Sequence, residues 1–161
     1  MLMINAEPEI ALKGRLSASL PLYYSGFNYF RGDLKFRTFT LQPTLRVWLG
    51  KSSAHGWWVG PHLGVAWFDV AFGGSRRYQD TRPAMGAGIS AGWRRPLGRS
   101  GRWTLEVSLG AGVYSTKYDV FANHCDGARL ESRSRVWAGL DRVALSIGRI
   151  FDLGPKKGGR R

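Results

Sequence analysis

The sequence predicts an all-β protein, an antiparallel up-and-down transmembrane β-barrel with eight strands when intact. Three observations predict this fold. Apolar and polar residues alternate with a period of two along most of the 161-residue chain, the pattern of strands with two different faces. Glycine occurs 22 times and aromatic residues make up 13% of the chain, a composition that favours strands and turns. No apolar run approaches the roughly 18 residues that a membrane-spanning helix needs.

The N-terminal strands are predicted from alternation of unequal regularity. Residues 10–20 alternate roughly, with Ile10 and Leu16 on one face and Lys13 and Arg15 on the other. Residues 38–48 alternate more cleanly. The odd positions there are Phe39, Leu41, Pro43, Leu45 and Val47, and the even positions are polar up to Trp48. Together with the chain between them, these segments predict the first three strands.

The C-terminal strands alternate in the same way over residues 57–67, 85–94, 103–118 and 135–151. One face of these strands carries Trp, Val, Leu, Ile and Met, and the other carries mainly Gly, Ser and Thr with isolated charges. We count seven strands in total. In a soluble barrel the apolar face packs inward, but here the polar face is unusually small. Small polar residues fit the narrow lumen of a membrane barrel, in which the apolar face meets lipid.

Aromatic residues near the predicted strand ends fit the girdles that mark membrane interfaces. They are Trp48, Trp57, Trp58, Trp67, Trp93, Trp103 and Tyr118. Connections near residues 13–15, 51–56 and 98–102 are short, whereas those near residues 25–33, 73–83 and 121–134 are long. Outer-membrane barrels have short periplasmic turns and long external loops, so the last strand is expected to end in the periplasm.

Strand parity predicts a further segment. A bacterial barrel closes with an even number of strands, and seven strands are visible. We therefore expect the natural gene product to continue upstream with a first strand and a signal peptide. Residues 1–151 are predicted to form a single barrel domain, and residues 152–161 a disordered basic tail.

The predicted inner face carries a set of polar residues that we expect to form a structural network. They are Glu9, Gln42, Arg46, His62, Arg94, Glu106 and Arg142. Charges in so narrow a lumen must pair. We expect Glu106 to pair with Arg142, and Arg46 to join Glu9 or Glu106. The network is read as a plug that fixes register and blocks leakage, and the alternative is a proton or ion path.

The sequence offers little support for catalysis or for a cofactor. His62 has no evident Ser or Cys partner on its face, so we interpret it as a structural lumen histidine. His124, Cys125 and Asp126 are metal-ligand types on one loop, but zinc sites need three or four suitably spaced ligands. We expect no catalytic residue, no metal and no cofactor. An outer-membrane enzyme acting on lipid is the least favoured hypothesis.

The net charge of +13 includes 18 arginines, which are spread over both rims and the lumen. A nucleic-acid-binding protein would gather them on one face with stacking aromatics, so we expect no nucleic-acid partner. Fixed cations on or beside the external loops can bind lipopolysaccharide phosphates bidentately. The candidates for these contacts are Arg76, Arg77, Arg129, Arg133 and Arg135.

Several segments together resemble the domain-of-unknown-function 3575 family of bacterial outer-membrane β-barrel proteins. The matching segments are residues 42–49, 60–64, 86–92, 103–106, 110–114, 117–119 and 143–147, closing at Phe151. The resemblance implies an outer-membrane location and an extra strand before residues 7–12, but no activity. The chain departs from the family in the basic residues after Phe151 and in having one cysteine where relatives often have two.

These observations predict a small integral outer-membrane protein that is not an enzyme. Its role is expected to be structural, adhesive or as a component of an envelope assembly. The expected partners are the lipid bilayer, lipopolysaccharide and other outer-membrane proteins. The alternative is a soluble β-barrel module that binds a lipophilic ligand.

Overall fold

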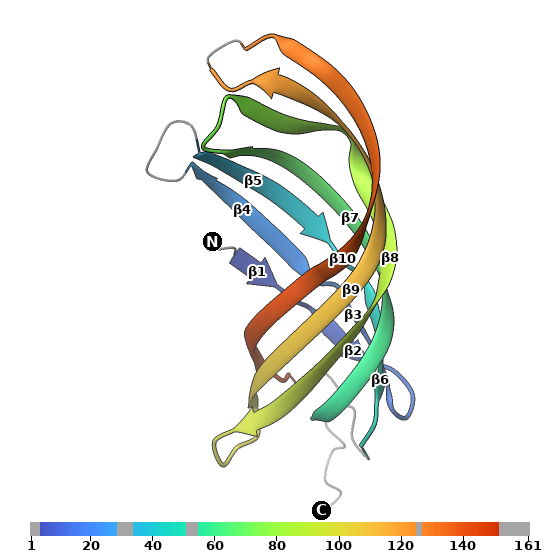
Figure 1. The fold of residues 1–161 in the computed structure, drawn as a ribbon. Helices are drawn as coiled ribbons and strands as arrows, with labels where there is room; N and C mark the ends of the chain where they lie inside the picture. The colour runs from blue at the N-terminus through green and yellow to red at the C-terminus, as the bar shows by residue number, and fades with distance from the viewer. Residues whose placement is uncertain (1–3, 29–33, 51–54, 125–126, 152–161) are drawn as a thin grey trace, which may run out of the picture.

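The computed structural model describes residues 4–28, 34–50, 55–124 and 127–151, and it is all-β. Ten antiparallel strands form one strongly curved sheet (Figure 1). The strands are β1 (Ile4–Ala6), β2 (Glu9–Ala11), β3 (Leu16–Ser19), β4 (Leu22–Asn28), β5 (Leu34–Leu41), β6 (Thr44–Trp48), β7 (Gly56–Phe72), β8 (Arg76–Leu97), β9 (Trp103–Ala122) and β10 (Arg129–Arg149). In the described part of the chain, no helix is long and apolar enough to cross a membrane.

The ten strands make up seven continuous runs, in agreement with the seven strands predicted. Prolines interrupt the first three runs, because a prolyl nitrogen cannot donate to the ladder. Pro8 separates β1 from β2, Pro21 separates β3 from β4, and Pro43 separates β5 from β6. Hydrogen bonds bridge each break. The Leu20, Gln42 and Leu63 amides donate to the carbonyls of Pro8, Pro21 and Pro43 at 2.9, 3.0 and 3.0 Å.

The seven runs form a meander in which each run pairs antiparallel with the next. The sheet is not closed. Among the described residues, β10 pairs only with β9, and β1 and β2 pair only with β4 and β3. Because the number of runs is odd, the two edge runs point in the same direction. Direct pairing of these edges would therefore break the antiparallel pattern.

Two of the predicted long loops are strand instead. The turn from β7 to β8 spans residues 73–75, since β8 begins at Arg76. Strand β9 continues to Ala122 and β10 begins at Arg129, so most of residues 121–134 is also strand. Within residues 25–33, β4 extends to Asn28, and residues 29–33 lie outside the described part. The strands continue because residues such as Tyr78 and Val120 still turn an apolar side chain toward the interior.

The short turns at the opposite end agree with the prediction. Residues 12–15 and 98–102 connect adjacent runs, and Gly14, Gly98 and Gly101 adopt φ values of 70°, 71° and 62° there. Side chains other than glycine rarely adopt this left-handed conformation.

The interior has two levels. Near the β7–β8 and β9–β10 turns it is apolar, with Val70, Ala71 and Val120 buried and the ring of Tyr118 6.2 Å from that of Phe68. Near the other end the buried residues are mostly polar or charged. The outer face shows the opposite order, since large apolar side chains cover it beside the polar interior. The long strands β8 and β9 therefore exchange their inner and outer chemistry along their length.

Candidate functional site: the polar interior

The polar interior is built by strand parity. Even-numbered residues of β9 from Thr104 to Ser108 face inward and are buried, while odd-numbered residues such as Val107 and Leu109 face outward. Glycines on the inner face leave room for a few large side chains. A Cβ at Gly92 would lie 2.6 Å from the Trp58 ring, and a Cβ at Gly88 would lie 2.7 Å from Nε2 of His62.

Three carboxylates and three guanidiniums meet in the interior as an ionic cluster: Glu7, Glu9, Arg46, Arg94, Glu106 and Arg142. Arg46 lies at its centre and is fully buried. It pairs with Glu7, with Glu9 at 2.5 Å and with Glu106 at 3.0 Å. Arg94 pairs with both Glu9 and Glu106 at 2.5 Å. The formal charges of these six side chains cancel, as buried charges require.

Two tryptophans complete this cluster. The Arg46 guanidinium lies 4.1 Å from the centre of the Trp58 ring, and that of Arg94 lies 4.9 Å from the Trp48 ring. Trp48 also donates from Nε1 to Oγ of Ser17 at 2.9 Å. Cation–π contacts of desolvated arginines contribute about 2 kcal/mol or more.

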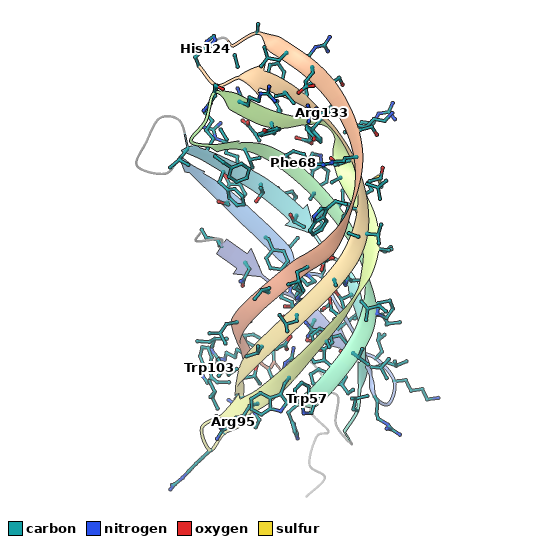
Figure 2. The ribbon with its side chains drawn as sticks, in the orientation of Figure 1. Trp57, Phe68, Arg95, Trp103, His124 and Arg133 are labelled. Atoms are coloured by element: carbon teal, nitrogen blue, oxygen red, sulfur yellow. The ribbon has the colours of Figure 1, made fainter. Side chains whose placement is uncertain are left out.

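The predicted aromatic girdle is wrong for three of its seven residues. Trp48 and Trp58 are 0% and 1% exposed, and Tyr118 also lies inside. They occupy inward positions of their strands, where rings pack against arginines or other aromatics. Trp57, Trp67, Trp93 and Trp103 do lie on the outer face. Figure 2 shows Trp57 and Trp103 near one end of the sheet together with Arg95, and Arg133 and His124 near the other.

Arg46 was predicted to pair with Glu9 or Glu106, and it pairs with both, but the predicted pair of Glu106 with Arg142 is wrong. The strand register explains the difference. Glu106 lies opposite Ser146 of β10, whereas Arg142 lies opposite Gly110, about 13 Å further along the strand. Arg142 instead reaches Glu7 at 2.9 Å and donates to Oγ of Ser108 at 3.0 Å.

A second polar group surrounds His62, and we call it the histidine cluster. Oγ of Ser90 lies 2.7 Å from Nδ1 of His62, and Oδ2 of Asp141 lies 2.6 Å from Nε2. Tyr114 donates to the same Asp141 oxygen at 2.7 Å, and Gln42 donates to the Tyr114 hydroxyl at 3.4 Å. The expectation that no serine faces His62 is therefore wrong.

Serine, histidine and carboxylate follow one another here in the order of a hydrolase triad. In such a triad Nε2 of the histidine faces the serine and Nδ1 faces the carboxylate, whereas here Nδ1 faces Ser90 and Nε2 faces Asp141. Ser90 and His62 are 1% and 2% exposed, and a Cβ at Gly110 would lie only 2.6 Å from Oγ of Ser90. The histidine cluster instead ties β7, β8, β9 and β10 together. Among the described residues, no group of three His, Cys, Asp or Glu side chains could hold a metal ion.

Sequence reasoning missed Glu7, Ser90, Tyr114 and Asp141. Glu7 shares the parity of Glu9 across the Pro8 break, so extending the alternation would have found it. Asp141 has the wrong parity, and it enters the interior through a register shift between Leu140 and Arg142. A β-bulge of this kind re-aims side chains and leaves no clear trace in one sequence.

The arginines proposed to bind lipid phosphates lie on strands rather than loops, and four of them already have acidic partners. Arg77 pairs with Asp69 at 2.6 Å, and this hydrogen bond raises the pKa of the Arg77 guanidinium above its ordinary value. The other pairs are Arg76 with Glu131 at 3.8 Å, Arg129 with Asp119 at 3.4 Å and Arg133 with Glu131 at 2.7 Å. Arg135 is exposed at the edge of the sheet. Of the loop trio, Cys125 and Asp126 lie outside the described residues.

Residues 1–151 match the model of a family described as protein of unknown function, DUF3575. The chain belongs to this family. The match confirms the family that the sequence resembles, and it spans all of the described strands of this DUF3575 protein. No curated protein and no solved structure matches the chain.

Proposed function

We propose that this DUF3575 protein is an integral β-barrel of the bacterial outer membrane that has no enzymatic activity. Its role is structural, adhesive or as a component of an envelope assembly. One observation carries the proposal: beside the polar interior, the outer face is apolar. Leu109, Val143 and Ile147 are 53%, 74% and 69% exposed, whereas Arg46, Glu106 and Arg142 are buried. Such an arrangement is stable where the outer face meets lipid.

The dimensions of the apolar surface fit a bilayer. Outward residues of β9 are apolar from Trp103 to Val113, a stretch we call the apolar band. Ten residues of antiparallel strand, tilted by about 40°, rise by about 25 Å, the height of the apolar belt on outer-membrane barrels. Aromatic pairs flank the band. Trp57 and Trp93 lie 6.5 Å apart near one border, and Phe39 and Trp67 lie 5.7 Å apart near the other.

The open edges support closure of the sheet by one further strand. A strand antiparallel to both β10 and the β1–β2 run would restore the antiparallel pattern. The Arg142 side chain of β10 and the Glu7 side chain of the β1–β2 run meet in a 2.9 Å ion pair between the two edge runs. Nη1 of Arg142 and Oδ1 of Asp141 are buried without a hydrogen-bond partner among the described residues. Inward polar side chains on the closing strand would pair with them.

The interior acts as a plug in this proposal. Its ionic cluster is neutral, its tryptophans fill the space between charges, and its glycines admit no further atoms. A proton or ion path would need a continuous file of mobile groups or water. The crossing hydrogen bonds of Arg46 and of Asp141 instead hold several strands in one register.

The soluble alternative lacks a supporting observation. A lipophilic ligand would need an enclosed apolar pocket, and the interior at the level of the apolar band is polar. The two apolar grooves described in the structure open on the outer face, one beside Leu45 and Leu63 and the other beside Trp57 and Leu109. In water, this outer surface would be a large exposed apolar patch of the kind that drives aggregation.

Fractionation of the natural gene product tests the proposal. We expect the protein to float with outer-membrane vesicles, to resist extraction by urea or carbonate, and to migrate faster on a gel before boiling than after. A protein that stays monomeric in buffer without detergent would refute it.

Hydrogen exchange of the detergent-solubilised protein tests closure separately. A closing strand protects nearly every amide of residues 136–149 on β10, whereas an edge strand leaves alternate amides unprotected. Fast exchange at alternate positions would argue against a closed barrel.

A further inference from the structure

Three residues form a polar row on the outer face of neighbouring strands. Arg82 of β8 lies directly opposite Lys117 of β9, and Lys117 lies directly opposite Ser134 of β10. All three side chains are exposed. Directly opposite residues of antiparallel strands share one face of the sheet, so the three polar groups stand side by side. We call these residues the boundary row.

The boundary row combines two like charges without a counterion. Like charges directly opposite each other on a sheet are destabilising. The four described carboxylates at this end of the sheet are engaged elsewhere. Asp69, Asp119 and Glu131 form ion pairs with other arginines, and Asp80 accepts a hydrogen bond from the Phe68 amide at 3.2 Å. Within the described part of the chain, Arg82 and Lys117 thus have no acidic partner.

The boundary row lies just beyond the apolar part of the outer face. The next matched row toward the apolar band consists of Met85, Ser115 and Val136, of which Met85 and Val136 are 61% and 70% exposed. Register shifts on both sides of Arg82 place it opposite Lys117. Bulges of this kind re-aim a side chain. The two cations therefore lie one step beyond the apolar surface, the depth at which a bilayer places its head groups.

We propose that the boundary row binds a phosphate of a lipid head group in the outer leaflet. The inference rests on the proposed membrane location. The Arg82 guanidinium would donate two parallel hydrogen bonds to phosphate oxygens, Lys117 would add a point charge, and the Ser134 hydroxyl would donate a third contact. The phosphate would remove the repulsion between the two cations. The acyl chains of the same lipid would continue along the apolar band beside Met85.

Native mass spectrometry of the full-length protein in a non-ionic detergent tests this site. The probes are diphosphoryl lipid A, the same glycolipid without its phosphates, and inorganic phosphate. We expect the wild type to retain the diphosphoryl form, and the double variant Arg82→Gln, Lys117→Gln to bind it about tenfold or more weakly. The matched control, Arg95→Gln, Arg99→Gln, removes two exposed cations at the opposite rim and should bind it as the wild type does.

Three results would overturn the proposal. Equal loss of binding in both double variants would show that only net charge matters. Equal binding of the dephosphorylated glycolipid would exclude the phosphate as the recognised group. Saturation by inorganic phosphate at the same concentration as the lipid would assign the row to a free anion. Heat-modifiable migration of each variant, measured in parallel, reports on membrane folding. A wild-type protein without heat-modifiable migration would refute the proposed membrane function, whereas the three binding results above bear on the lipid site.

Discussion

The depth of a charge on the outer face is the sharpest test of membrane insertion, and two leucines provide a matched pair. Leu109 lies near the middle of the apolar band on β9 and is 53% exposed. Leu130 lies on β10 beyond the band and is 55% exposed. Arginine at either position removes the same side chain and adds the same charge. In the proposed arrangement Leu109 faces lipid, whereas Leu130, which lies at a register shift near the end of the edge strand, faces water.

The expected magnitudes follow from the positions of the two leucines. Arginine on the lipid face of a barrel costs about 2–4 kcal/mol at the bilayer midplane and about 0–1 kcal/mol near or beyond the interface. Leu109→Arg should therefore lower the free energy of unfolding by about 2 kcal/mol or more relative to Leu130→Arg. A difference of that size changes the folding equilibrium about thirtyfold.

Reversible unfolding of the full-length protein in lipid vesicles, followed by tryptophan fluorescence and by heat-modifiable migration, gives both free energies. In a soluble barrel, both leucines would be exposed to water and both substitutions would cost less than about 0.5 kcal/mol. Equal and small effects would therefore refute the membrane reasoning.

Three further predictions concern the interior. Glu106→Ala should destabilise the fold by about 3–5 kcal/mol without producing large conductance, because it leaves three guanidiniums of the ionic cluster facing only two carboxylates. Glu131→Ala, which removes a partly exposed carboxylate, is the control in thermal unfolding and planar-bilayer recordings. Large, stable conductance of the wild type would contradict the plug. Gly60→Ala should prevent folding, since its Cβ would overlap the Leu45 carbonyl, whereas Gly74→Ala meets open space and should fold normally on the same gel assay. Ser90 should not react with a fluorophosphonate probe, and labelling that disappears in Ser90→Ala would show that a substrate can enter.

Strand order and facing were predictable from the sequence because alternation records which side of a strand is buried. Arg46, His62 and Glu106 were assigned to the interior on parity alone, and they lie there. Partners were less predictable, because they depend on register. Arg142 lies opposite Gly110, four residues along β9 from Glu106, and this offset decides which carboxylate the arginine meets. The offset depends on strand register, which a single sequence does not reveal.

The long-loop prediction failed for a related reason. Residues 76–83 and 129–134 read as loop because most of their side chains are polar or charged. The apolar alternation of the band stops there, so the sequence predicts the end of each strand where its surroundings change. The strands continue because Tyr78 and Tyr118 pack edge to face, with ring centres 6.0 Å apart.

The Pro43 break also protects the pairing of the β5–β6 run with β7 against misalignment. A slip of two residues keeps every side chain on its proper face, so polarity alone does not prevent it. At this point a slip in one direction would bring the nitrogen of Pro61, which carries no hydrogen, opposite the Pro43 carbonyl that accepts from the Leu63 amide. Each carbonyl left without a donor in lipid costs several kcal/mol. Pro43 and Pro61 together therefore disfavour a slipped register that the alternation of side chains alone would allow.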